Sequence, residues 1–239
     1  MIGLRSGIIA SSSRSVNLYD GLISAYNFDS DATDQKGTND GTLDGGETLV
    51  TGKIGNAYQF VASGYMDIGN SFPIDSDKPF SFAFWVKTDN GGIANILTNL
   101  YSDGSRQGFS ITMAIAGDLD FAGRIGFQLV PENLLGLAVQ TNNDYNDGAW
   151  HHVVCTYDGS SDISGLNIYV DGVSDSYILN GTTMTGSITT TETIKVGGRT
   201  GYVQLFSGII DIVKIWGREL TSSEVVYDYN SGAGREYPA

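Results

Sequence analysis

Several residue types are scarce in this sequence of 239 residues, and each scarcity excludes a kind of structure or partner. There is one cysteine, Cys155, so no disulfide can form within the chain. No apolar run approaches the roughly 18 residues that a membrane-spanning helix needs, so we expect no membrane insertion. Basic residues number 13 against 27 acidic ones, for a formal net charge of −14. We therefore expect no general affinity for nucleic acid, because binding phosphates requires clustered Lys and Arg.

Glycine is abundant, with 32 residues, and hydrophobic residues make up 41% of the chain. Residues 80–87 alternate with a period of two, so that Phe80, Phe82, Phe84 and Val86 share one face of a strand. Asp171-Gly172 is typical of a tight hairpin turn. Further strands are predicted at 111–116, 124–130, 150–157, 166–170, 193–198 and 208–216. This pattern favours one all-β domain with many short strands.

One short helix is expected near the C-terminus. Thr221 with Glu224 three residues later forms a capping box, and Val225 and Tyr229 lie one helical turn apart. Residues 21–239 are interpreted as one domain. Residues 1–20 form a Ser-rich arm that carries Arg5 and Arg14, which we expect to anchor the protein in an assembly; a floppy terminus is the alternative.

Eight segments together resemble laminin-G-like jelly-roll domains of the concanavalin A-like lectin/glucanase superfamily. They are residues 22–29, 34–43, 55–60, 65–68, 80–87, 150–159, 169–172 and 206–224, which occur in the order found in that family. The resemblance implies a two-sheet antiparallel jelly-roll sandwich, with one structural Ca²⁺ in many members. It does not determine a function, because this fold serves lectins, adhesins, hydrolases and capsid proteins alike. Residues 229–239 more loosely resemble the tail of such domains in tailed-phage structural proteins.

Asp211 is the most informative single residue. It has apolar neighbours on both sides in the predicted strand 208–216, and an unpaired buried carboxylate costs several kcal/mol. The resemblance implies that this acid helps to hold Ca²⁺ together with Asp34, Asn39 and the carbonyl oxygen of Gly37. A second acid that follows in many family members is replaced here by Ile212, so the alternative is an Asp211 satisfied by an arginine or by backbone donors.

We expect no enzymatic activity. Glucanases of the resembling superfamily use an acid and a nucleophile spaced as Glu-x-Asp-x-x-Glu on one strand, and no such run occurs here. No nucleophile elbow is present either. The two histidines, His151 and His152, are predicted to point to opposite faces of one strand and to serve structural roles. A glycan hydrolase or lyase with an unfamiliar site is a remote alternative.

Two functional hypotheses follow. The first is a non-catalytic, virion-associated structural or decoration protein of a phage head or tail, with other virion proteins or further copies of itself as partners and the virion surface as its location. The start of the sequence resembles a signal peptide only loosely, which agrees with a virion protein that leaves the cell by lysis. The second is a carbohydrate-binding adhesin or lectin module on a cell or virus surface, with a host-surface glycan as its partner.

Overall fold

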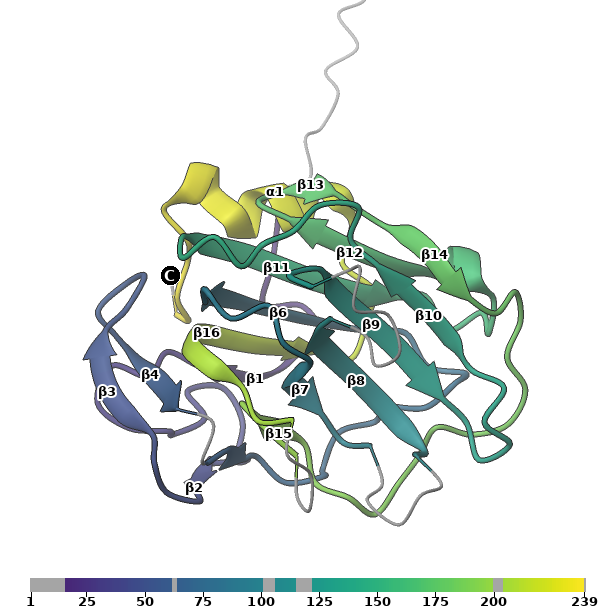
Figure 1. The fold of residues 1–239 in the computed structure, drawn as a ribbon, viewed down its shortest axis with the longest axis horizontal. Coiled ribbons are helices and arrows are strands. Elements are labelled where there is room, and N and C mark those ends of the chain that lie inside the picture. The colour runs from purple at the N-terminus through teal and green to yellow at the C-terminus, as the bar shows by residue number, and fades with distance from the viewer. Residues whose placement is uncertain (1–15, 62–63, 101–105, 115–121, 200–203, 239) are drawn as a thin grey trace, which may run out of the picture.

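The computed structural model describes residues 16–61, 64–100, 106–114, 122–199 and 204–238. Two antiparallel β-sheets of eight strands each pack face to face (Figure 1). Sheet A has the order β13 (Val173–Ser174), β12 (Leu166–Val170), β11 (Trp150–Tyr157), β6 (Phe80–Lys87), β16 (Ser207–Trp216), β4 (Asn56–Val61) and β3 (Thr48–Thr51), with β1 (Leu22–Tyr26) also paired to β16. Sheet B has the order β14 (Tyr177–Asn180), β10 (Leu137–Gln140), β9 (Ile125–Val130), β8 (Gly108–Met113), β7 (Ala94–Thr98), β15 (Lys195–Val196), β5 (Met66–Asp67) and β2 (Thr42–Leu43).

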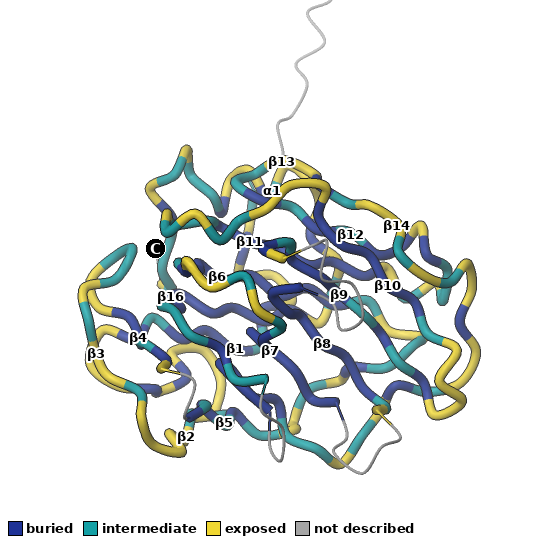
Figure 2. Tube along the Cα trace, viewed as in Figure 1, coloured by how far each residue is buried: buried dark blue, intermediate teal, exposed yellow. Residues whose placement is uncertain are grey.

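The main core lies between the two sheets, and the buried segments run through the middle of the molecule (Figure 2). Phe80, Phe82, Phe84 and Val86 all point into it, as their alternation predicts. Phe82 of sheet A stacks on Phe109 of sheet B with ring centroids 4.5 Å apart. The predicted all-β, two-sheet antiparallel sandwich is therefore confirmed.

Strand β16 changes its pairing partner halfway along its length. Its first half pairs with β4, from Ser207 to Ile210, and its second half pairs with β1. The register against β6 shifts between Asp211 and Lys214, and Ile212 within this shift has a positive φ of 50°. Such a β-bulge breaks the alternation of side chains.

A smaller second core lies on the outer face of sheet A. It contains Leu22, Ala25, Ala83, Val154, Trp216, Leu220 and Val225, and it is covered partly by α1 (Ser222–Tyr229). The capping box predicted at Thr221 and Glu224 is present at the start of this helix. Two short 3₁₀ turns, η2 (Ile163–Gly165) and η3 (Asn230–Gly232), complete the elements. No helix in the described ranges is long and apolar enough to cross a membrane.

A buried ionic cluster fastens α1 to sheet A. Asp228 of α1 is fully buried and pairs with Lys214 of β16, while its second carboxylate oxygen lies 3.2 Å from Nε2 of His152 on β11. His152 lies under the helix, whereas His151 binds Asp171 and Asp147 at 2.9 Å and 3.1 Å. Both histidines thus contact carboxylates of the folded chain, while Nδ1 of His152 has no partner among the described groups.

Residues 16–20 pack against the domain. The indole N–H of Trp216 donates to the carbonyl oxygen of Leu18 at 2.7 Å, which ties this segment to the end of β16. Residues 1–15, which include Arg5 and Arg14 of the expected anchoring arm, lie outside the described residues.

Candidate functional site

The predicted calcium ligands Asp34, Gly37 and Asn39 lie together in one loop beside β1. The carboxylate of Asp34 accepts hydrogen bonds of 2.7–3.2 Å from the Ser24 hydroxyl and from four backbone N–H groups, those of Ala25, Lys36, Gly37 and Asn39. Burial alone would raise the pKa of Asp34, but these donors outweigh it and hold the pKa below its usual value. The carboxylate thus ties the loop to β1.

Asp211 lies elsewhere, on the outer face of sheet A. Its Oδ2 accepts from the backbone N–H groups of Lys53 and Ile54 at 2.8 Å and 3.2 Å, and its Oδ1 is buried without a hydrogen-bond partner. Burial raises the pKa of Asp211 to about 7, with a smaller contribution from the negative charge of Glu236. The predicted burial of Asp211 is confirmed, and backbone donors satisfy one of its two oxygens.

The Asp34 loop does not fit a calcium ion, because donor hydrogens already point at both of its carboxylate oxygens. Asp211 Oδ1 and Glu236 Oε1 are different, since both are buried and lack a hydrogen-bond partner. No cluster of three or more His, Cys, Asp or Glu residues able to hold a metal occurs in the described ranges. A calcium ion bound here would need backbone or water oxygens beside these two acids. Calcium therefore stays a prediction, and Glu236, which sequence reasoning missed, replaces Asp34 as the second candidate acid.

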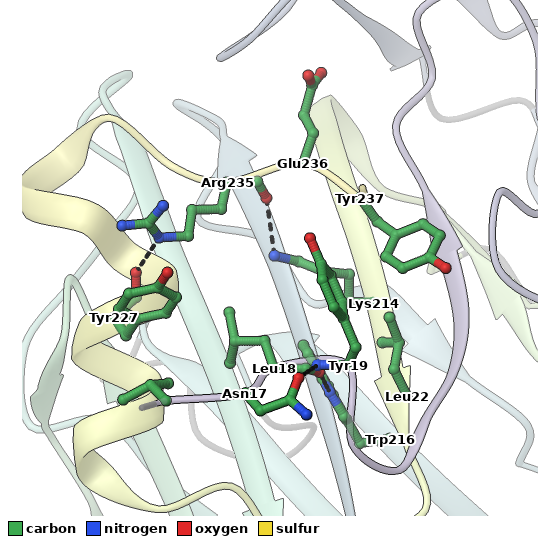
Figure 3. Close-up of a pocket in the computed structure, with 11 residues that line it drawn as sticks. Asn17, Leu18, Tyr19, Leu22, Lys214, Trp216, Tyr227, Arg235, Glu236 and Tyr237 are labelled. Atoms are coloured by element: carbon green, nitrogen blue, oxygen red, sulfur yellow. Dashed lines mark hydrogen bonds between the residues drawn. The ribbon is translucent and has the colours of Figure 1, made fainter. Parts of the chain in front are cut away.

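A pocket of about 260 Å³ opens beside this region, between the two ends of the described chain (Figure 3). We call it the terminal pocket and define it by Asn17, Tyr19, Lys214, Tyr227, Arg235 and Tyr237, over a base of Leu18, Leu22 and Trp216. Tyr227 and Arg235 stand on its α1 side and Tyr237 stands on the opposite side (Figure 3). Segments more than 190 residues apart in sequence thus form one site.

Backbone hydrogen bonds hold two tyrosines of the terminal pocket, Tyr19 and Tyr237, in place. Tyr19 follows Leu18, whose carbonyl oxygen is bound by Trp216. Both backbone polar groups of Tyr237 bind the side-chain amide of Asn27, at 2.6 Å and 3.2 Å. The rings of Tyr19 and Tyr237 meet edge to face with centroids 5.1 Å apart. Aromatic pairs of this geometry are favourable, so each ring helps to hold the other in position.

The two cations of the pocket are also held in place. The Arg235 guanidinium donates to the Tyr227 carbonyl oxygen at 2.7 Å and lies 3.9 Å from the centre of the Tyr227 ring. Because of the bulge in β16, Lys214 lies on the outer face of sheet A. It donates to the Arg235 carbonyl oxygen at 2.9 Å and pairs with Asp228. Burial alone would raise the pKa of Asp228, but Lys214 and then His152 lower it to about 2. These charges are therefore fixed before any ligand arrives.

The terminal pocket combines an apolar base, aromatic walls and a few polar groups. Tyrosine rings offer flat apolar faces, and Asn17 and Arg235 offer donors at the rim. None of its described lining residues is a Ser, Cys or His, and the side chain of its one carboxylate, Glu236, points away from the other labelled residues (Figure 3). This arrangement suits binding of a small amphipathic ligand such as a sugar ring. Sequence reasoning could not select these tyrosines, since tertiary folding alone brings them together.

A family model described as the Concanavalin A-like lectin/glucanases superfamily, of the laminin G type, matches residues 60–226. No curated protein matches the chain. Among solved structures, domain 4 of AbnA, a GH43 extracellular arabinanase from Geobacillus stearothermophilus in complex with arabinotriose, is 18% identical with a TM-score of 0.66. The match covers 90% of this chain and 98% of that domain.

Toxin domains show the same fold. The botulinum neurotoxin serotype C1 binding domain is 17% identical with a TM-score of 0.69, and the match covers 90% of this chain and 53% of that one. The binding domain of Botulinum Neurotoxin DC in complex with SialylT is 18% identical, with a TM-score of 0.65 and coverages of 90% and 52%. The chain thus spans about half the length of these toxin binding domains.

Proposed function

Since the chain belongs to the laminin G family of the Concanavalin A-like lectin/glucanases superfamily, we propose that it is a non-catalytic carbohydrate-binding module whose terminal pocket holds a sugar. The observation that carries the proposal is the edge-to-face pair of Tyr19 and Tyr237 in one pocket with Arg235. Tyrosine faces contact the C–H surfaces of a sugar ring, while Asn17 and Arg235 bind its hydroxyl groups.

Two further observations support this proposal. The similar arabinanase domain and one similar toxin domain were each solved with a bound ligand, arabinotriose and SialylT respectively. In addition, the sequence contains no Glu-x-Asp-x-x-Glu run, the arrangement that glucanases of this superfamily use. We infer from a ligand of this class that the module works at a cell or particle surface or outside the cell.

Replacing Tyr19 with alanine is expected to weaken sugar binding by at least about tenfold, because truncating an aromatic anchor commonly costs more than 1 kcal/mol of binding free energy. A glycan array that includes arabino-oligosaccharides and sialylated sugars identifies the ligand, and calorimetry then compares the variants. Tyr177→Ala is the matched control, because Tyr177 is similarly exposed (51% against 42%) but lies on sheet B. Equal affinities of the Tyr19 variant and the unchanged protein would contradict the assignment of the pocket, and a lack of binding to any glycan would contradict the function.

We also propose a second function, that of a virion-associated structural or decoration protein anchored by the arm of residues 1–20. Its support is the likeness of residues 229–239 to phage structural proteins. Deleting residues 1–15 is expected to abolish incorporation into particles, as measured by immunoblotting of purified virions. The deletion should stop before Val16, because Leu18 is hydrogen-bonded to Trp216 and its loss would disturb the domain itself. Normal incorporation of the shortened chain would contradict the anchoring role.

A further inference from the structure

A second pocket lies on the outer face of sheet B. Side chains from neighbouring strands form a row there, in which Thr98, Ser110, Gln128, Ala138 and Asn180 are register partners across β7, β8, β9, β10 and β14. Their strand neighbours Phe109, Leu129 and Leu137 point into the main core, so this row faces outward. At its β14 end is a groove of about 220 Å³, which we call the sheet-B groove.

The lining of the sheet-B groove carries one positive charge and two amides. Arg106, Gln128 and Asn180 supply these groups, and Val130, Leu134 and Ala138 supply apolar surface between them. Within the described ranges, no acid pairs with Arg106, and no hydrogen bond occupies the side chains of Gln128 or Asn180. The groove thus presents a guanidinium that no described acid pairs with, and its lining contains no carboxylate.

The backbone of the groove is strained at two places. Arg106 and Leu134 have positive φ values of 55° and 64°, a region that residues with a side chain rarely adopt. Leu134 closes a turn with its N–H bound to the Pro131 carbonyl oxygen at 2.9 Å, and its side chain is 54% exposed. Backbone strain of this kind is concentrated at ligand sites and other functional positions. The two residues with positive φ supply a cation, Arg106, and an apolar side chain, Leu134, to the same groove.

We propose that the sheet-B groove binds a saccharide that carries a carboxylate, of the sialic or uronic acid class. A guanidinium binds a carboxylate through two parallel hydrogen bonds, which makes Arg106 the residue that selects the acid. Gln128 and Asn180 bind hydroxyl or N-acetyl groups, and Leu134 with Ala138 contacts the apolar side of the ring. Ala138 between the two amides leaves room for the ligand to approach the sheet.

This inference rests on the proposed carbohydrate-binding function and adds a ligand class and a second site to it. The sheet-B groove and the terminal pocket lie on the outer faces of opposite sheets. Two sites that face opposite ways would let one domain contact two glycan chains at once. Binding at the sheet-B groove depends on Arg106, and binding at the terminal pocket depends on Tyr19, so the two can be tested separately.

The test titrates the full chain with N-acetylneuraminic acid and glucuronic acid, and with glucose and glucuronamide as uncharged counterparts, followed by NMR. The acids are expected to shift the amide signals of Gln128 and Asn180, and their affinity should fall as salt is added. Arg106→Gln is expected to weaken acid binding at least about tenfold, because the paired charge-assisted hydrogen bonds are lost. Lys87→Gln removes a charge from another part of the molecule and serves as the control, with thermal melting confirming that both variants are folded.

Three results would overturn the proposal. They are acid binding that Arg106→Gln leaves unchanged, equal binding of glucuronic acid and glucuronamide, and shifts confined to the terminal pocket. Neutral glycans that still bind in a Tyr19-dependent manner would then show that the proposed function holds and only the second site fails. A chain that binds no sugar, acidic or neutral, would overturn both proposals together.

Discussion

Asp228→Ala is expected to lower the free energy of unfolding by about 3–5 kcal/mol, the usual cost of removing one partner from a buried ion pair. Asp228 is fully buried, and its loss leaves the Lys214 ammonium without a countercharge beneath α1. His152 loses its carboxylate partner Asp228 at the same time. Because Lys214 also lies in the terminal pocket, the variant should bind sugar less well even where it remains folded.

Urea denaturation at pH 7 measures this effect. Asp228→Asn keeps the shape of the side chain but removes its charge, so it should fall between the alanine variant and the unchanged protein. Asp77→Ala is the control, because Asp77 pairs with Lys78 at the surface, where removing an ion pair has little effect. A loss below about 1 kcal/mol in Asp228→Ala would show that the buried cluster does not hold the helix in place.

Asp211→Asn is expected to stabilise the protein at alkaline pH. The folded-state pKa of Asp211 is raised from 3.8 to about 7, so the protonated acid adds stability that is fully present below pH 4 and is lost as the pH rises through 7. A shift of this size corresponds to a difference on the order of 4 kcal/mol between pH 4 and pH 8. Asparagine is neutral at every pH, its oxygen can accept from Lys53 and Ile54, and its NH₂ replaces the unpaired oxygen.

The measurement is the melting temperature of both proteins from pH 4 to pH 8, with EDTA and with added calcium. We expect the variant to be more stable than the unchanged protein above pH 7, and the protein with Asp211 to lose stability over the same range in EDTA. Calcium bound to ionised Asp211 and Glu236 would reverse the order of stability, so that the variant is less stable than the unchanged protein. EDTA would then lower the melting temperature of the unchanged protein and leave that of the variant as it is. An unchanged melting temperature in EDTA would exclude a structural calcium ion.

Local patterns were sufficient wherever neighbours in the sequence decide the structure. Strands β6, β11 and β12 have the predicted bounds, because their alternating side chains fit a sheet with one face on the core. The Asp171-Gly172 turn has positive φ at both residues, and the capping box starts α1 at the predicted position. The short strands β7, β10 and β14 were not predicted, since tertiary pairing stabilises them more than their own composition.

The candidate sites show where such reasoning stops. Asp34 has the sequence position of a metal ligand, but the folded loop surrounds its carboxylate with donors. The bulge at Ile212 places Asp211 and Lys214 on the same outer face, which a strict period of two would not allow. Asp228 is an ordinary helix residue in the sequence, and only the packing of α1 on sheet A makes it a buried ion-pair partner.

The sequence by itself determined the class of fold, the faces of the long strands, the C-terminal helix and the burial of Asp211, because each depends on residues within one strand or one turn of helix. Tertiary structure alone decided the two pockets. Tyr19 and Tyr237 come from opposite ends of the chain, and Arg106 and Asn180 from distant segments. Their proximity arises from strand pairing across long separations, and no local pattern encodes it.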